Sequence, residues 1–468
     1  MNAFERSVSG IRGQGGFFSS EAPVYISRAP GRLDLMGGNV DYTGGLVFQS
    51  TIREATWAAA QRRSDRRIIF LNPQMKEEGW QEQVEFDLQD LVSEKAVKDL
   101  VNASPGVRWT AYVLGAFLLF RHRYPEQVKV GASIYIESEV PRNKGVSSSA
   151  AVEVAVMKAA AACYGIPLEG IALAEACQWV ENVIAESACG IMDQAASVLG
   201  DEGHVMPLLC QPCLPRPLVK LREGLRCWAI DSGVRHQVTG IEYEAARAAA
   251  FIGYRMICEW ENLPITKDES GPIPRYAEPR WGGYLSNLSP SVFRSKYERR
   301  LPELLSGAEI LSRGAVHPDP FTSVRSEVNY RVRACTRYAI EENQRIELFI
   351  ELARASTEQP SLASFRQMGE LMFQSHWSYT ECGLGCEATD QLIELVRRHA
   401  GEDLLFGAKI TGGGAGGTVA VLGSAQGSDA FGRVVADYAK MQAFRPYVFE
   451  GSSIGADLFG IRELSVSA

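Results

Sequence analysis

A loop of glycine and serine that runs directly into a strong helix former constrains this chain more than any other stretch. Residues 140–157 read V-P-R-N-K-G-V-S-S-S-A-A-V-E-V-A-V-M. Gly145 allows a close approach of the backbone to a ligand, and the serine hydroxyls are donors and metal ligands. A helix start has unpaired N–H groups and a partial positive charge, which favour an anion. From this stretch alone, two interpretations stay open: a phosphate-binding loop, or an ordinary serine N-cap before a buried helix.

Size and composition indicate a globular protein. The chain has 468 residues, 46% of them hydrophobic, which is enough for a large core and for two or three domains of ~150 residues each. The net charge of -8 disfavours nucleic-acid and anionic-membrane partners. No signal core precedes residue 20, and the longest apolar run, 113–120, is too short to span a membrane. We therefore expect a cytoplasmic protein with reduced cysteines.

A second glycine-rich stretch lies near the start of the chain. Residues 28–45 read R-A-P-G-R-L-D-L-M-G-G-N-V-D-Y-T-G-G and follow a short β-type run at 24–27. Glycines with interleaved arginine and aspartate favour a ligand-facing loop over the alternative, a solvent-exposed turn.

The periodicity of the rest predicts a mixture of strands and helices. Strands are expected at 51–62, 67–71, 131–136, 227–231, 407–411 and 418–422, and helices at 109–124, 148–163, 168–185, 241–258, 327–355, 362–379 and 389–398. The stretch 264–320 loses periodicity and holds eight of the 21 prolines, which indicates an irregular insertion of unassigned role. The run G-G-G-A-G-G at 412–417 implies that the backbone approaches something closely.

Two single residues keep alternatives open. Asp193 stands among apolar neighbours, as either a buried cap or a catalytic carboxylate. Trp109 is either a core residue or an aromatic that stacks on a flat ligand.

Three motifs in order resemble those of the superfamily of galactokinase, homoserine kinase, mevalonate kinase and phosphomevalonate kinase (GHMP). They are P-G-R-x-D-L-M-G-G-x-x-D-Y at 30–42, P-x-x-x-G-V-S-S-S-A at 141–150 and K-I-T-G-G-G-A-G-G at 409–417. Further motifs at 28–32, 189–194 and 231–236 narrow the resemblance to the galactokinase branch. It implies a two-lobed α/β (α+β) fold. The active site would lie in the cleft between lobes 22–210 and 211–462, the latter with the insertion at about 264–320.

One departure from galactokinases concerns the sugar. They have G-E-H-T-D-Y where this chain has G-G-N-V-D-Y at 37–42, and their glutamate and histidine hold the hydroxymethyl end of the hexose. L-Arabinopyranose has the ring hydroxyl pattern of galactose without that sixth carbon. A buried glutamate facing nothing would reject a pentose roughly 10⁴-fold, and Gly38 removes that penalty. The chain also resembles the kinase half of plant L-arabinokinases, which share the departure.

The resemblance implies roles for individual residues. Asp193 would accept or orient the proton of the sugar O1, beside the positive charge of Arg32. The sugar-binding residues would be Asp41, Gly38, Asn39, Gly190 and Tyr243. The nucleotide would contact Trp109, Lys144, Gly145, Val146, Ser147, Ser148, Ser149 and Ala150, opposite the glycines Gly412, Gly413 and Gly414. Magnesium would take Ser149 and Glu181 as ligands.

The resulting hypothesis is ATP-dependent phosphorylation of the anomeric hydroxyl of L-arabinose, with Mg²⁺ and with the sugar and ATP as partners. A galactokinase or a uronic-acid 1-kinase is the alternative with the same chemistry. A galactokinase-like sugar sensor without turnover is the alternative of another class. The intact sequence at 147–150, together with Asp193 and Arg32, disfavours the sensor.

Overall fold

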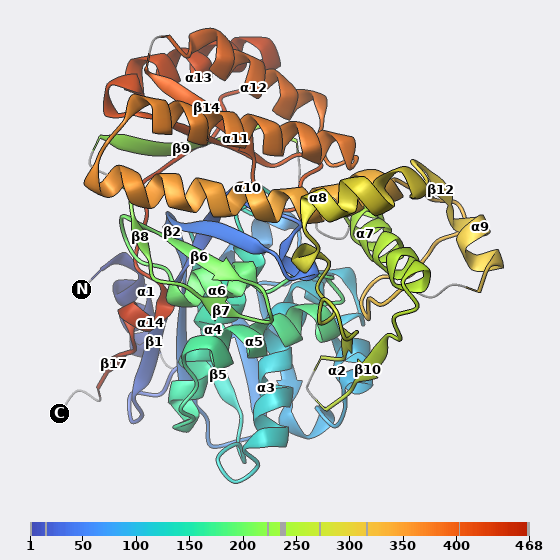
Figure 1. The fold of residues 1–468 in the computed structure, drawn as a ribbon. Coiled ribbons are helices and arrows are strands. Elements are labelled where there is room, and N and C mark those ends of the chain that lie inside the picture. The colour runs from blue at the N-terminus through green and yellow to red at the C-terminus, as the bar shows by residue number, and fades with distance from the viewer. Residues whose placement is uncertain are drawn as a thin grey trace.

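The computed structural model describes residues 2–14, 16–221, 224–234, 240–270, 273–314, 317–401 and 403–465. It has a mixed α/β architecture with two main sheets, which confirms the expected fold class. The long helix α10 (Val332–Glu358) runs between the two tiers of the molecule (Figure 1). No helix in these described ranges is long and apolar enough to cross a membrane.

The first sheet is built on a long antiparallel pair, β1 (Val24–Met36) and β2 (Leu46–Arg62). Its strand order is β17-β1-β2-β5-β3-β4, and β6 pairs with the first part of β2. The β3–β5 pair is parallel. The remaining strands are β3 (Arg67–Leu71), β4 (Gln83–Asp87), β5 (Ala132–Ser138), β6 (His204–Leu209), β7 (Leu214–Pro215), β8 (Val219–Lys220) and β17 (Arg462–Leu464).

Strand β1 is longer than the sequence indicates. The prediction of a loop from residue 28 is wrong, because pairing with β2 continues to Met36. The register shifts between Pro30 and Arg32, where the proline has no N–H to donate. This shift leaves the Arg32 N–H free to donate to the carbonyl of Val146 at 3.1 Å. The loop itself spans 37–45 and contains η1 (Asp41–Thr43). We call it the sugar loop after the role that the resemblance predicts for it.

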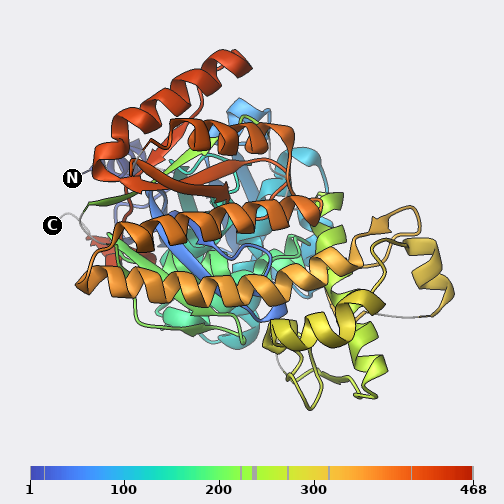
Figure 2. The ribbon, with the colours of Figure 1, turned by 45° about the horizontal axis from the view of Figure 1, so that its top comes forward.

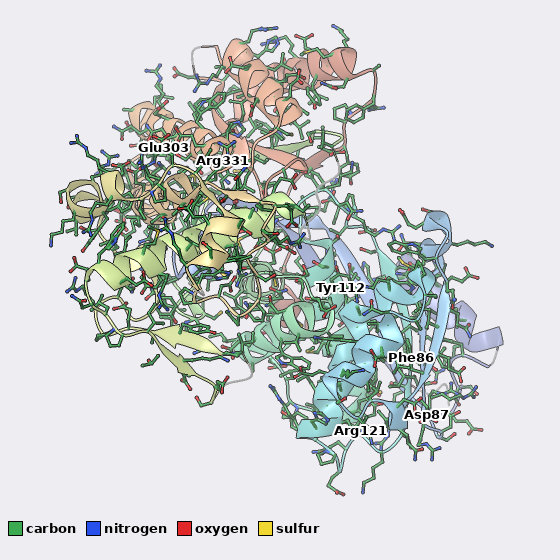
Figure 3. The ribbon with its side chains drawn as sticks, turned by 90° about the vertical axis from the view of Figure 1, so that its right-hand side faces the viewer. Phe86, Asp87, Tyr112, Arg121, Glu303 and Arg331 are labelled. Carbon is green, nitrogen blue, oxygen red and sulfur yellow. The ribbon has the colours of Figure 1, made fainter. Side chains whose placement is uncertain are left out.

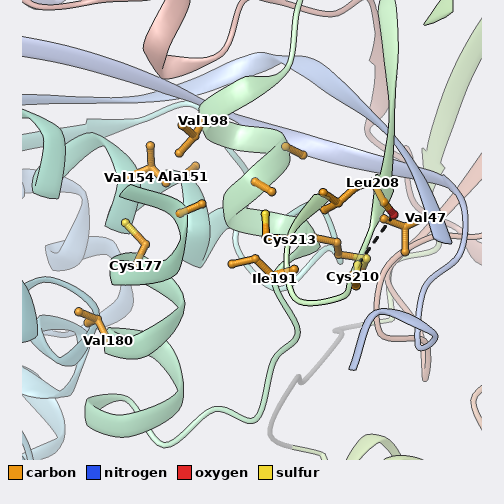
Figure 4. Packing of buried hydrophobic residues seen from close by; sticks show 14 of the residues in the cluster. Val47, Ala151, Val154, Cys177, Val180, Ile191, Val198, Leu208, Cys210 and Cys213 are labelled. Carbon is orange, nitrogen blue, oxygen red and sulfur yellow. Dashed lines mark hydrogen bonds between the residues drawn. The ribbon is translucent and has the colours of Figure 1, made fainter. Parts of the chain in front are cut away.

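Helices α4 (Ser148–Tyr164) and α6 (Met192–Leu199) pack on the first sheet. Helices α2 (Glu94–Val101), α3 (Ala111–Arg123) and α5 (Gly170–Trp179) form a further layer, in which α3 and α5 pack on α4 and α2 packs on α3. Helix α4 packs on β1 and β2, and its alanines permit the close approach. Figure 4 shows Ala151 and Val154 of α4 and Val198 of α6 on one side of this core. Val47 and Leu208, from β2 and β6, lie on the other.

The second sheet is antiparallel, in the order β14-β15-β9-β16. Its strands are β14 (Leu405–Ile410), β15 (Thr418–Ser424), β9 (Leu225–Asp231) and β16 (Val448–Glu450). Helices α11 (Leu362–Glu381) and α12 (Glu387–His399) pack on its strands, and α13 (Ser428–Gln442) packs on α12. Trp228 of β9 stacks on Phe431 of α13 at 4.8 Å between ring centroids. The chain passes from the first sheet to the second between β8 and β9, and β17 returns to the first.

The outer flank of the first sheet is closed by elements that the sequence did not reveal. Helix α1 (Ala3–Gln14) stacks Phe4 on Trp57 and Tyr135, and α14 (Ala456–Phe459) lies against α6. Near the β4 edge of the sheet, Arg121 of α3 donates to the carbonyls of Gln89 and Leu91. Figure 3 labels Arg121 together with Asp87, the last residue of β4. These contacts fix the sheet on which the site is built.

The insertion (264–320) lies beside one end of α10 (Figures 1 and 2). It follows α7 (Ile241–Trp260), and its described residues contain short elements only. These are β10 (Thr266–Asp268), β11 (Arg275–Ala277), η6 (Leu285–Asn287), α8 (Pro290–Val292), η7 (Phe293–Tyr297), η8 (Glu298–Arg300), β12 (Leu305–Ser306) and α9 (Gly307–Ser312). Strand β13 (Asn329–Tyr330) pairs with β12, so α10 begins at Val332 rather than at the predicted 327.

Candidate active site

The centre of the candidate site is an ion pair between β1 and the first turn of α6. The Nε and Nη2 atoms of Arg32 both lie 2.8 Å from Oδ1 of Asp193. Nη1 of Arg32 donates to the carbonyl of Gly145 at 2.6 Å. Arg32 is buried, whereas the Asp193 side chain keeps 19% of its surface exposed. One cation therefore joins a partly accessible carboxylate to the loop before α4.

That loop has the geometry of an anion site rather than of a serine cap. Asn143, Gly145 and Ser147 all have positive φ, at 60°, 71° and 61°. Ser147 is the N-cap residue of α4, but its side chain makes no capping hydrogen bond. Its Oγ is buried without a hydrogen-bond partner in the described part of the chain. The ordinary cap is thus excluded, and Ser148, Ser149 and Ala150 form the first helical turn, with its unpaired N–H groups.

Lys144 is engaged within the chain. Its Nζ lies 2.5 Å from Oδ2 of Asp231 on β9, and its carbonyl accepts a hydrogen bond from Thr418 of β15 at 2.7 Å. The loop before α4 is therefore anchored to the second sheet. The neighbouring motif residues Arg235 and His236 lie outside the described residues.

The glycine run at 412–417 lies against Gly145 and Arg32. A Cβ on Gly412 would lie 2.7 Å from the carbonyl oxygen of Gly145 and 3.2 Å from Nη2 of Arg32. Gly414 has φ 83° and meets Leu384 and Tyr379 in the same way. The close backbone approach expected from G-G-G-A-G-G is confirmed, and Gly413 lies between these two contacts.

Asp41 and Gly190 meet on the other side of Asp193. A Cβ on residue 190 would lie 1.8 Å from Oδ2 of Asp41, so only glycine fits there. The N–H of Tyr42 donates to Oδ1 of Asp41 at 2.7 Å. Burial and the charge of Asp193 raise the pKa of Asp41 to about 7, although Arg247, the Tyr42 N–H and Arg32 lower it. Asp41 is therefore a buried acceptor close to the ion pair.

Tyr243 of α7 stands beside this acceptor. It is buried and meets Tyr42 edge to face at 6.1 Å between ring centroids. Burial, and after it the charge of Asp41, raise the pKa of Tyr243 well above its ordinary value. Asp41, Gly190 and Tyr243, which are far apart in the sequence, thus lie close together in the fold.

Two tyrosines, which the sequence analysis did not identify, contact Gly37, Gly38 and Asn39. A Cβ on Gly38 would lie 2.0 Å from the Tyr379 hydroxyl oxygen. That hydroxyl accepts from the N–H of Asn39 at 2.9 Å and donates to the carbonyl of Gly412 at 2.7 Å. The Tyr338 hydroxyl donates to the carbonyl of Gly37 at 2.7 Å. Both tyrosines occupy buried positions of long helices, where the sequence pattern is that of core residues.

The side-chain amide nitrogen of Asn39 is not used as a donor in the described part of the chain. This Nδ2 atom is buried and has no hydrogen-bond partner among the described residues. A buried amide without a partner is costly, and such groups are frequent at ligand sites.

A second polar cluster lies at the start of α4. Glu181 belongs to a π-helical turn, η5 (Val180–Ile184), of the kind common at functional sites. Ser149 donates to Glu181. Nε2 of Gln194 donates to Glu181 at 2.6 Å and to Glu153 at 3.1 Å. Burial and the charge of Asp193 raise the pKa of Glu181 to about 7. Burial and the charge of Glu181 raise that of Glu153 well above its ordinary value.

This cluster fits a hard divalent cation. Two carboxylates and a hydroxyl are the oxygen ligands that Mg²⁺ prefers, and Oε1 of Glu153 is buried without a partner in the described structure. The described residues contain no group of three or more His, Cys, Asp and Glu that could hold a metal. A cation here would therefore also need oxygens from a ligand. Glu153 was not predicted, because its V-E-V context resembles any helix.

Trp109 has the contacts of a core residue. It lies at the end of η4 (Pro105–Thr110), where its Nε1 donates to the carbonyl of Gln81 at 3.0 Å. Its ring meets Phe70 at 6.3 Å. Contact between Trp109 and adenine stays a prediction.

Comparison with protein families gives three matches. Residues 16–62 match the galactokinase galactose-binding signature, residues 111–201 the GHMP kinases N terminal domain, and residues 339–440 the GHMP kinases C terminal. These ranges include the sugar loop, the loop before α4 and the helices around the glycine run.

Two curated relatives cover most of this chain. The galactokinase of Chloroflexus aurantiacus is 30% identical over 89% of this chain and 88% of its own length. The L-arabinokinase of Arabidopsis thaliana is 34% identical over 97% of this chain. The match covers only 48% of that protein, so the chain spans about half of its length.

Solved structures share the fold. Lactococcus lactis galactokinase, complexed with galactose, has a TM-score of 0.74 at 20% identity, over 97% of this chain and 99% of that one. The mevalonate kinase of Methanococcus jannaschii has a TM-score of 0.54 at 12% identity, over 92% and 98%.

Proposed function

The chain belongs to the GHMP kinases as a sugar kinase of the galactokinase type, and we propose that it phosphorylates the anomeric hydroxyl of L-arabinose. Kinases of this family use ATP as the phosphoryl donor. The product would be L-arabinose 1-phosphate, with ADP.

The position of Tyr379 carries the proposal for the pentose. In galactokinases, a glutamate at the position of Gly38 and the histidine after it hold the hydroxymethyl group of the hexose. Here the Tyr379 hydroxyl oxygen lies only 2.0 Å from the position that a Cβ of residue 38 would take. Its hydrogen bonds to Asn39 and Gly412 keep it there. A sugar without the sixth carbon needs no partner at this end, while Asp41, Gly190 and Tyr243 remain for the ring hydroxyls.

Charge pairing disfavours a uronic acid. A substrate carboxylate would need a cation that is not already neutralised. Arg32, Arg247 and Lys409 are buried around the sugar loop, and each is paired, with Asp193, Asp319 and Asp34 respectively. None of these three cations is therefore available to a sugar carboxylate.

The arrangement supports in-line phosphoryl transfer. The Asp193 carboxylate would take the proton of the sugar O1 as that oxygen forms its bond to the γ-phosphorus and the bond to the ADP oxygen breaks. Arg32 would keep Asp193 ionised and offset charge on the transferred group. Ser149 and Glu181 would hold Mg²⁺, which neutralises phosphate charge when bound. Backbone N–H groups of the loop from Lys144 to Ala150 would bind the phosphates.

A coupled ADP-release assay tests the function. The purified chain is incubated with ATP and Mg²⁺ and with L-arabinose, D-galactose, D-galacturonate or D-glucuronate. We expect the highest kcat/KM with L-arabinose and a ³¹P signal of an anomeric phosphate in the product. A higher kcat/KM for galactose or for a uronate contradicts the assignment of the sugar. If none of the four sugars gives ADP release, the proposed kinase activity is contradicted.

A further inference from the structure

The insertion, whose role the sequence left open, contacts the sugar loop directly. The ring of Tyr284 lies against Gly44, where an added Cβ would be 2.2 Å from the ring. The hydroxyl of Ser286 lies 3.0 Å from that of Thr43. The segment that ends in η6 therefore packs on the outer side of the sugar loop.

The end of the insertion reaches the same region through a buried ion pair. Oδ1 and Oδ2 of Asp319 accept hydrogen bonds from Nη2 and Nε of Arg247, each at 2.8 Å. The two side chains are 0% and 4% exposed. Thr322 also donates to Asp319, at 2.5 Å. A bidentate pair thus joins the insertion to α7.

Arg247 lies over the ring of Tyr42 in the sugar loop and over that of Phe321. The guanidinium carbon lies 4.8 Å from the ring centroid of Tyr42 and 5.5 Å from that of Phe321. Arg247 follows Tyr243 by one helical turn, so both side chains project from the same face of α7. Nη1 of Arg247 is buried and has no hydrogen-bond partner in the described ranges.

We propose that Asp319 sets the affinity for the sugar by holding Arg247 away from Asp41, so that the Asp41 carboxylate stays available to sugar hydroxyls. A buried cation and a buried carboxylate attract each other strongly unless another partner neutralises one of them. Without Asp319, Arg247 would pair with Asp41 and occupy its acceptor oxygens. Arg247 is then a positioning residue, and the insertion is part of the sugar-binding apparatus. This inference rests on the proposed function.

The electrostatics agree with this geometry. The charge of Arg247 already acts to lower the pKa of Asp41 against the effect of burial. Burial opposes the ionisation of Asp319, but Arg247 more than compensates and the pKa of Asp319 is lowered. Both members of the pair are therefore charged at neutral pH.

The direct test is Asp319→Asn in the full chain. We expect KM for the sugar to rise about tenfold, the factor that ~1.4 kcal/mol of lost binding gives. KM for ATP and kcat at saturating sugar should stay within about twofold. The matched control is Asp457→Asn, which removes the carboxylate partner of buried Lys158, between α4 and α14. It should lower the Tm and leave KM for the sugar unchanged.

A pH profile separates positioning from a merely structural role. The groups around Asp41 are Asp193 on α6, Arg32 on β1, Arg247 and Tyr243 on α7, Tyr379 on α11, Cys189 before α6 and Cys210 after β6. Among these groups, Asp319→Asn removes the charged partner of Arg247, and outside them it affects the hydrogen bonds that Asp319 accepts from Phe321 and Thr322. An Arg247 that turns to Asp41 favours the ionised carboxylate, so the acid limb of kcat/KM for the sugar should move to lower pH.

A second variant keeps the test open if Asp319→Asn does not fold. Arg247→Lys keeps the charge but loses the planar fork, so two parallel hydrogen bonds to Asp319 cannot form. Arg247→Lys should also raise KM for the sugar. Asp319→Glu retains the charged partner of Arg247, so its KM for the sugar should stay closer to that of the wild type than the KM of Asp319→Asn does. An active wild type, with sugar KM and acid limb unchanged in both Asp319→Asn and Arg247→Lys, overturns this inference alone. A wild type without activity on any sugar contradicts the proposed function instead.

Discussion

At the scale of the residue, the candidate site depends on side chains whose charge or size is unusual for their position. Asp193 keeps partial exposure beside a buried Arg32, and Asp41 is a buried carboxylate with a raised pKa. Gly38 is small because Tyr379 takes its space. Each feature leads to a measurement.

Asp193→Asn should separate catalysis from folding. The amide cannot accept the proton of O1, so we expect kcat to fall by roughly 10²–10⁴-fold, the usual contribution of a general base. Tm and KM for ATP should change little. Turnover close to that of the wild type would contradict the role of Asp193.

The pKa of Asp41 predicts how stability depends on pH. Because the folded-state pKa is raised from 3.8 to about 7, the folded protein binds the proton more tightly than the unfolded chain. The stabilising effect of the protonated form is complete below about pH 4 and is lost as pH rises toward 7. Asp41→Asn should therefore have a higher Tm than the wild type at pH 8, and the difference should vanish near pH 4. It should also weaken sugar binding. A Tm difference that does not vary with pH contradicts this account.

Tyr379→Ala tests the discrimination between pentose and hexose. Removing the ring opens space at Gly38 and leaves Asn39 without its partner. We expect the ratio of kcat/KM for L-arabinose over D-galactose to fall by about tenfold, the value of ~1.4 kcal/mol. Tyr438→Ala is the control: this buried tyrosine of α13 donates to Ser232 and should cost stability with no change in the ratio. An unchanged ratio in Tyr379→Ala would refute the role of the ring.

At the scale of the element, the site depends on interruptions of regular structure. The register shift in β1 directs the Arg32 N–H to the loop before α4, and the left-handed Ser147 begins α4 without a side-chain cap. The π-helical turn η5 brings Glu181 to Ser149. These irregularities bring strand and helix ends to the candidate site.

Glu181→Gln tests the element η5. Loss of the carboxylate should raise the Mg²⁺ concentration for half-maximal activity by about tenfold, with KM for the sugar unchanged. Glu342→Gln is the matched control, because Glu342 is a buried carboxylate of α10 that bonds Arg345 and Ser375. If both variants have the same Mg²⁺ dependence as the wild type, Glu181 is not a ligand.

At the scale of the whole molecule, the two sheets are joined by a fully buried ion pair. Nζ of Lys409 on β14 lies 2.8 Å from Oδ2 of Asp34 on β1, and Gln49 donates to Oδ1 of Asp34 at 2.5 Å. The N–H of Asp34 donates to Thr411, next to the glycine run. This pair fixes the glycine run relative to Arg32.

Lys409→Met should destabilise the molecule by about 3–5 kcal/mol, because it leaves Asp34 buried without its cation. The double variant Lys409→Met/Asp34→Leu should recover a large part of that loss, measured as Tm. Equal Tm values for the single and double variants would show that the unpaired carboxylate is not the cause.

Much of the local geometry of the candidate site could be predicted from the sequence, because its parts are local motifs. The loop before α4, the glycine run and the sequence around Asp193 each have a local composition that indicates close backbone approach or a helix start. The second part of β1, residues 28–36, was mispredicted as a loop because glycine and proline are typical of loops, and only pairing with β2 makes this segment a strand. Glu153 was missed because a single carboxylate in a helix has no local signature.

The sequence by itself was enough to predict phosphoryl transfer, because the loop before α4 and the glycine run are local motifs. Their backbone conformation depends on neighbouring residues. The tertiary structure decided which distant side chains lie around residues 37–45 and which partners they have. Tyr379 meets Gly38 and Asp319 meets Arg247 across separations of 341 and 72 residues. No local pattern encodes such pairs, since the partners are brought together only by the packing of α7, α11 and the insertion around residues 37–45.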